Sequence, residues 1–245
     1  MAVGVGAYLA LASAIVAGIF AALVFRQYAT KRRVFQLVWG VGLALFTLAS
    51  ALEFVSELAG GWGPTLYRTY FSLHPTLVAV LGLGTVYLLA DKRVGHGFLV
   101  YILVFFGILL FFTATATLAV SAADPNRILC PADTDPLPCE PGRVVGASAM
   151  PDAVRNLSLL FTIPGSAALI GGALYSWYRT RGSYNLLIAA GAGLMATGGT
   201  LTRLGQAELL YIFLLGGIAI LFVGFLRSLE VSRAPTQQAT PASAQ

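Results

Sequence analysis

The sequence predicts an all-α membrane protein, a bundle of seven transmembrane helices. Of its 245 residues, 58% are hydrophobic and 10% are charged, and the mean hydropathy is +0.81. Because a helix rises about 1.5 Å per residue and the hydrocarbon core is about 30 Å thick, about 20 apolar residues span it. Seven apolar stretches meet this length: 5–25, 34–56, 65–90, 97–120, 155–178, 183–205 and 208–226.

The boundaries of the first four spans follow from charges and turn residues. Basic residues come after the first stretch, at 26–33, whereas a secretory signal peptide carries them before its apolar run, so this span is expected to be retained. The segment Gly60-Gly61-Trp62-Gly63-Pro64 separates the second span from the third, and Pro64 suits a first helical turn. Gly95 and Gly97 flank the turn before the fourth span.

The last three spans carry signals of kinking and close packing. Pro164 is expected to kink the fifth span, as Pro75 is expected to kink the third. The turn at 181–183 leads into the sixth span. Small residues let transmembrane helices approach closely, and the sixth span carries many of them: Ala189, Gly191, Gly193, Thr197, Gly198 and Thr202.

Residues 1–228 are expected to form one transmembrane domain, with little chain outside it. The longest gap between spans, residues 121–154, is an expected external loop. Residues 229–245 are small, polar and proline-containing, which predicts a disordered cytoplasmic tail. Basic residues cluster at membrane edges rather than on a soluble face, so we expect no nucleic-acid partner. The expected partners are membrane lipids and a small-molecule ligand or a second membrane protein.

The charges of the connecting segments predict the orientation, because Lys and Arg gather on the cytoplasmic side of membrane proteins. Eight of the ten Asp and Glu residues fall at the opposite end of the spans from the main basic group. The N-terminus is therefore expected outside and the C-terminus in the cytoplasm. The basic group comprises Arg26, Lys31, Arg32, Arg33, Lys92, Arg93, Arg179, Arg181, Arg227 and Arg233.

A shift of 150 residues aligns parts of the two halves of the chain. Thr30-Lys31 then lies on Thr180-Arg181, and Glu53 lies on Arg203. Spans one to three and five to seven also share an orientation, with span four between them. This pattern is compatible with a parallel three-plus-one-plus-three repeat, although any two helices rich in Ala, Gly and Leu look alike.

Ionisable residues inside spans are costly, and here they concentrate near the external half. Together they predict an outward-facing polar pocket, with Glu53 as the deepest acid and Arg203 or Arg68 as its partner. The alternative is that the shallower charged residues snorkel to water. The candidate ligand-binding or proton-linked residues are Glu53, Glu57, Arg68, Tyr70, His74, Arg203 and Glu208.

Cys130 and Cys139 both lie in the expected external loop. An oxidising exterior favours a disulfide between them, and their spacing is wider than that of a redox-active Cys-x-x-Cys pair. We therefore expect a structural disulfide.

Several cofactors and reactions are not expected. The only lysines, Lys31 and Lys92, lie in loops, which excludes a retinal Schiff base. The only histidines, His74 and His96, are expected on opposite membrane sides, which argues against a multi-histidine zinc site and a bis-histidine haem. No hydrolase motif or phosphate-binding loop is present, and we assign no catalytic residue or metal ligand. Ser166 has no histidine in its own span to activate it.

Two segments carry a resemblance to known sequences. WGVGLALFTLASALEF at 39–54, and LYRTYFSL followed by LGLGTVYLLA within 66–90, resemble small bacterial seven-span integral membrane proteins of unassigned function. The resemblance covers about the first third of the chain. It implies a multi-pass protein of the bacterial plasma (inner) membrane and supplies no catalytic residues.

Three functions remain open on the sequence alone. The first is a non-enzymatic protein that binds, senses or transports a small ligand through the outward-facing pocket. The second is a structural or accessory subunit of a larger membrane complex. The third is a membrane enzyme that acts on lipid.

Overall fold

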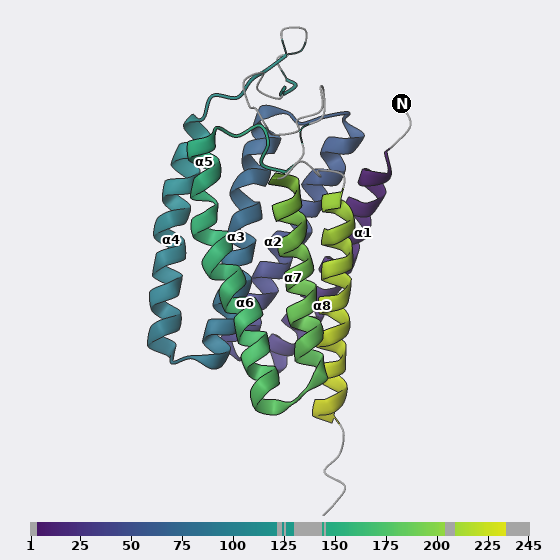
Figure 1. The fold of residues 1–245 in the computed structure, drawn as a ribbon, viewed down its shortest axis with the longest axis vertical. Helices are drawn as coiled ribbons and strands as arrows, with labels where there is room; N and C mark the ends of the chain where they lie inside the picture. Colours follow the sequence, from purple (N-terminus) through teal and green to yellow (C-terminus); the bar gives the residue numbers. More distant parts are fainter. Residues whose placement is uncertain are drawn as a thin grey trace, which may run out of the picture.

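The computed structural model describes residues 4–121, 124, 126–129, 144, 146–203 and 209–233, and within these ranges the fold is all-α (Figure 1). An isolated bridge between Val120 and Ile128 is the one strand-like pairing in this part of the chain. The helices are α1 (Val5–Lys31), α2 (Val34–Leu58), α3 (Pro64–Leu89), α4 (Lys92–Thr115), α5 (Asp152–Leu157), α6 (Leu159–Thr180), α7 (Ser183–Arg203) and α8 (Leu209–Arg233).

Six segments of the described chain are long and apolar enough to cross a membrane: α1, α2, α3, α4, α8, and α5 together with α6. This is the architecture of a multi-pass membrane protein. The remaining long helix, α7, has 21 residues but is less apolar because it carries several glycines and threonines. The expected seventh crossing therefore depends on α7, and composition alone does not establish it.

Several helix boundaries differ from the sequence expectation: α1 continues to Lys31 rather than ending at residue 25, and the expected span 155–178 is divided between α5 and α6. Helix α4 starts at Lys92 and ends at Thr115, five residues before the expected limits at each end. Its first turn carries Lys92, Arg93 and His96, because a helix can continue past the hydrocarbon core with its charged side chains in water. Helix α8 likewise continues to Arg233, into the expected tail, and residues 234–245 lie outside the described ranges.

Six helices form a closed ring in the order α1, α2, α3, α6, α7, α8 and back to α1. Helix α4 lies outside this ring, against α3 and close to the short α5. We call the end that carries α5 and residues 116–121, 126–129 and 146–150 the loop end, at the top of Figure 1. The opposite end, which carries the short connections at 32–33, 90–91 and 181–182, is the turn end.

Glycines bring the ring helices into backbone contact at two crossings. A Cβ on Gly165 of α6 would lie 2.6 Å from the carbonyl oxygen of Val78 on α3, and a Cβ on Gly191 of α7 would lie 2.6 Å from the carbonyl oxygen of Gly217 on α8. Close packing of the sixth span is thus confirmed for Gly191. For Gly193 it is wrong, because a Cβ there would meet no atom within 4 Å.

The interior of the ring is filled at the turn-end half. The ring of Phe20 on α1 lies 5.1 Å from Phe222 and 4.8 Å from Phe225 on α8, centroid to centroid. Trp39 on α2 donates its indole N–H to the carbonyl oxygen of Leu81 on α3 at 3.1 Å. These side chains leave a void of only about 20 Å³, so this half is closed by packing.

Candidate ligand-binding cavity

The loop-end half of the ring encloses a cavity of about 480 Å³, which we call the central cavity. Its wall comes from α3 (positions within 70–81), α6 (within 158–169), α7 (within 192–200) and α8 (Leu210 and Leu214). Phe46 of α2 and Gly146 and Ala147 of the loop complete it. Pockets of roughly 300–1,000 Å³ that are mostly apolar with a few polar groups are typical small-molecule sites.

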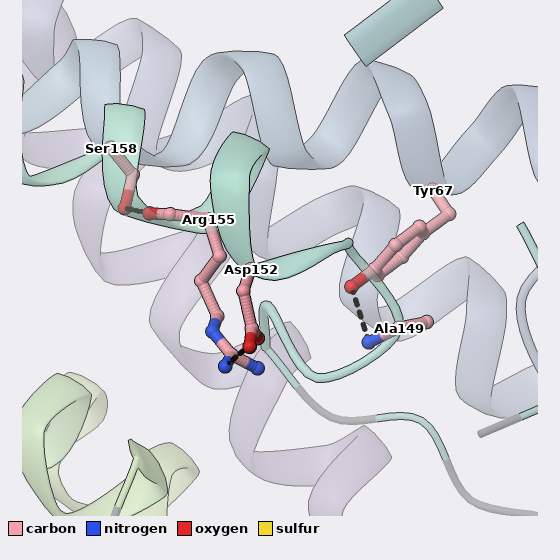
Figure 2. Close-up of polar contacts among 5 residues, drawn as sticks. All are labelled: Tyr67, Ala149, Asp152, Arg155 and Ser158. Atoms are coloured by element: carbon pink, nitrogen blue, oxygen red, sulfur yellow. Dashed lines mark hydrogen bonds and ion pairs between the residues drawn. The ribbon is translucent and has the colours of Figure 1, made fainter. Parts of the chain in front are cut away.

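The loop end of the cavity is held in place by hydrogen bonds from aromatic residues. Trp62 donates its indole N–H to the carbonyl oxygen of Val144 at 3.0 Å. The hydroxyl oxygen of Tyr67 accepts the backbone N–H of Ala149 at 3.0 Å (Figure 2). Both aromatic side chains are buried, so these bonds fix residues on either side of Gly146 and Ala147 against the bundle.

The entry into α6 is fixed by short-range contacts on the same side of the bundle (Figure 2). Arg155 forms an ion pair with Asp152, three residues earlier in α5. Ser158, at the junction of α5 and α6, donates its hydroxyl to the carbonyl oxygen of Arg155 at 2.6 Å. This junction places Ser158 and Leu159 on the cavity wall.

Behind the cavity wall, Glu53 of α2 is buried with 2% of its surface exposed. Its Oε1 accepts the hydroxyl of Tyr70 on α3 at 2.6 Å. Tyr70 lines the cavity, and its ring contacts Trp62 and His74 at centroid distances of 4.7 and 5.4 Å. Glu53 is therefore linked to the cavity wall by its hydrogen bond with Tyr70.

Most polar side chains on the wall already have a partner within the protein. Tyr70 donates to Glu53, Ser158 donates to Arg155, and hydroxyls of Thr162 and Thr200 donate to carbonyl oxygens four residues earlier. Two other polar side chains of the wall, His74 on α3 and Ser166 on α6, have no hydrogen-bond partner in the described part of the chain. These two groups are free to bind a ligand.

The remaining predicted site residues lie outside the cavity wall. Glu57 accepts the hydroxyl of Tyr211 on α8 at 3.1 Å. Arg68 donates to the carbonyl oxygen of Ala116 at 2.9 Å and so fastens the end of α4 to α3. The hydrogen bond to Glu53 thus comes from Tyr70 rather than from Arg68.

Four predicted residues fall where the structure gives no side-chain description. Arg203 ends α7, but its side chain is not described. Glu208, Cys130 and Cys139 lie outside the described ranges, so the disulfide stays a prediction.

Sequence reasoning missed Ser166 and Tyr211 as parts of this region. The sequence assigns Ser166 no role, because its own span has no histidine and His74 is the only candidate nearby, and the fold brings both residues to the same cavity. No hydrogen bond joins the two side chains, as an activated serine nucleophile would require. Tyr211 binds Glu57 from 154 positions away in the sequence, so no local spacing pointed to this contact.

Comparisons with protein-family models, with curated proteins and with solved structures found no match to this chain. Within the described ranges, no group of three or more His, Cys, Asp or Glu side chains is placed to hold a metal ion.

Proposed function

We propose that this protein is a multi-pass membrane protein that binds a small ligand in the central cavity. The observation that carries the proposal is the cavity itself, a space of about 480 Å³ inside a ring of membrane-type helices. Well-packed helices leave few voids larger than a water molecule, and the turn-end half of this same ring is packed in that way. A large space in one half alone is what a binding site requires.

The proposed orientation places the loop end outside and the turn end in the cytoplasm, with seven crossings that include α7. The exposed basic side chains of the turn end support it, since Arg32, Arg33, Lys92, Arg93 and Arg181 all lie there. Contact of α7 with α8 at Gly191 and Gly217 supports the seventh crossing, because it runs the two helices side by side. The cavity then lies in the outer half of the bilayer.

Filling the cavity tests the binding function. Gly199 lines the cavity and a Cβ there would meet no atom within 4 Å, so Gly199→Leu projects a side chain into the space. Gly193 on the same helix is equally open but is not part of the wall, so Gly193→Leu is the matched control. Native mass spectrometry after mild extraction should detect a small molecule on the wild type and on Gly193→Leu, and none on Gly199→Leu.

Two results would contradict the proposal. One is equal retention by Gly199→Leu and Gly193→Leu, which would place the bound molecule elsewhere. The other is a wild type that carries no small molecule and gains no thermal stability from a metabolite extract, since a ligand that binds the folded state raises its apparent stability.

The position of α4 favours a second candidate function, that of a subunit in a larger membrane complex. Only Gly95, Ile102, Leu109 and Thr113 of this helix are buried. Its outer side exposes large apolar residues, among them Val100, Leu103, Val104 and Phe111. Such a face suits either lipid or a partner helix. Co-purification of one fixed membrane protein, lost on replacing Leu103 and Phe111 with Ala, would support the subunit function.

A further inference from the structure

The central cavity reaches the side of the bundle between α6 and α7. Ile163 of α6 belongs to the cavity wall and is 63% exposed. Thr200 of the neighbouring helix α7 also belongs to the wall and is also exposed. In a membrane-spanning bundle, these exposed wall residues face the hydrocarbon of the bilayer.

The path of the two helices accounts for this opening. Helices α6 and α7 meet at the connection 181–182 and spread apart toward the loop end (Figure 1). Near the loop end α6 packs against α3, through Gly165, while α7 packs against α8, where Gly198 approaches Phe213. Helix α6 therefore lies against α3 and helix α7 against α8, and the space between α6 and α7 widens beside the cavity.

The other two directions out of the cavity are occupied by protein. Gly146 and Ala147 line it at the loop end, beside residues fixed by Trp62 and Tyr67. The aromatic residues around Phe20 fill the ring at the turn end. A ligand that comes sideways from the membrane therefore needs the least rearrangement of the protein.

The chemistry of the wall is that of a binding site for an amphiphile. Its surface is mostly aliphatic and aromatic, from residues such as Phe46, Phe71 and Met195. His74 and Ser166 are its two polar side chains without a hydrogen-bond partner among the described residues. An imidazole N–H and a hydroxyl can both donate to an oxygen acceptor, and the remaining wall suits a hydrocarbon chain.

Building on the proposed ligand-binding function, we infer that the ligand is a single-chain amphiphile taken from the bilayer. It enters between α6 and α7, places an oxygen-bearing head group at His74 and Ser166, and keeps its chain against the apolar wall. A buried polar group without a hydrogen-bond partner is costly in an apolar site. A head group with an oxygen acceptor gives both His74 and Ser166 a partner.

Photolabelling in nanodiscs tests the route and the class of ligand. The probe is palmitic acid with a diazirine on its chain, added to the full-length protein and mapped by peptide mass spectrometry. Crosslinks are expected within residues 159–166 of α6 and 195–200 of α7, and excess unlabelled palmitic acid should compete them away. Gly199→Leu should reduce this labelling at least fivefold, whereas Gly193→Leu should leave it unchanged.

The head-group contact is tested by a second pair of variants. His74→Leu should weaken palmitic acid binding by about threefold to tenfold, as expected for the loss of one hydrogen bond. His74→Gln retains an N–H donor and should recover most of that loss. A diazirine-bearing hexadecane, which has no head group, should bind the wild type and His74→Leu equally.

The outcomes separate this inference from the function on which it rests. If native mass spectrometry shows a molecule lost in Gly199→Leu but the palmitic acid probe labels neither α6 nor α7, the amphiphile inference is wrong and the binding function stands. Competable labelling confined to the outer side of α4 would equally overturn the inference. If native mass spectrometry shows no bound molecule and the palmitic acid probe gives no labelling, the binding function is overturned as well.

Discussion

Glu53 shows how one buried carboxyl group is accommodated between two apolar helices. It is 2% exposed, and the hydroxyl that it accepts belongs to Tyr70, which is itself 1% exposed. A buried polar group is costly chiefly when it is left without a partner. The pair therefore joins α2 to α3 beside the central cavity, and each side chain depends on the other for its hydrogen bond.

Replacing Glu53 separates hydrogen bonding from charge. Glu53→Gln retains an oxygen acceptor for Tyr70, so its free energy of unfolding should change by less than about 1 kcal/mol. Glu53→Leu leaves the Tyr70 hydroxyl without an acceptor and should lower the free energy of unfolding by about 1–3 kcal/mol. Reversible unfolding in detergent micelles measures both values, and equal losses would contradict the role assigned to this hydrogen bond.

The same variant tests whether Glu53 is linked to proton movement. If the protein transports its ligand with a proton, Glu53→Gln should abolish that coupling while the protein stays folded. The reason is that a side-chain amide, unlike a carboxyl group, does not take up and release a proton. Uptake into reconstituted vesicles with and without a pH gradient measures it. Unchanged gradient-driven uptake by the variant would exclude Glu53 as the proton-linked group.

Local spacing allowed some of these residues to be selected from the sequence, but not others. Tyr70 and His74 are four residues apart on one helix, which puts them on one face, and both line the cavity. Ser166 reaches the same cavity because α6 crosses α3 at Gly165, a contact between residues more than 80 positions apart. Periodicity within a single span carries no information about such a crossing.

Pro164 lies inside helix α6 and lacks the N–H that would bind the carbonyl oxygen of Leu160. Tyr101 of α4 donates its hydroxyl to that same oxygen at 2.7 Å. A helix outside the ring thus satisfies a carbonyl that the proline leaves free. The sequence predicts the kink from Pro164, but it does not predict that α4 supplies the missing donor.

A double-mutant cycle tests this contact. Tyr101→Phe should lower the free energy of unfolding by about 0.5–1.5 kcal/mol, because the Leu160 carbonyl loses its donor. In a Pro164→Ala background the restored N–H binds that oxygen, so the cost of Tyr101→Phe should fall close to zero. Equal costs in the two backgrounds would show that the tyrosine acts independently of the proline.

The crossing of α3 and α6 requires glycine at its closest point. Gly165→Ala would put a Cβ 2.6 Å from the carbonyl oxygen of Val78 and should lower the free energy of unfolding by about 1–3 kcal/mol. Gly171 lies on the same helix with no atom within 4 Å of a Cβ, so Gly171→Ala should be neutral or raise stability by up to about 1 kcal/mol. A similar loss in both variants would indicate a general effect on helix α6 rather than a clash at the crossing.

The ring of six helices has the neighbour pattern of two related halves. Contacts of α1 with α2 and of α2 with α3 match those of α6 with α7 and of α7 with α8, and α3–α6 matches α8–α1. Helix α4 then occupies the place of the connecting span outside the ring. This pattern is compatible with the three-plus-one-plus-three repeat expected from the sequence, and the repeat stays a prediction.

Hydropathy predicts the long apolar helices, because this property depends on local composition, whereas the seventh crossing and the orientation stay predictions. The central cavity in the loop-end half of the ring and the close packing in the turn-end half depend on which helices become neighbours. Phe20 and Phe225 meet from opposite ends of the chain to close the turn-end half. That contact, and therefore the location of the cavity, could not be read from either segment alone.

Whether α7 crosses the membrane decides the topology of the whole molecule, and labelling of cysteines from one side can settle it. With seven crossings, the loop end and the end of α8 at Arg233 lie on opposite sides. An impermeant maleimide applied to right-side-out vesicles should label Cys130 and Cys139 only after reduction, as expected for an external disulfide. In a background with both replaced by Ser, Lys92→Cys and Arg233→Cys should be labelled only after the vesicles are opened. Labelling of Arg233→Cys, but not of Lys92→Cys, in sealed vesicles would mean that α7 does not cross, because α8 would then end outside.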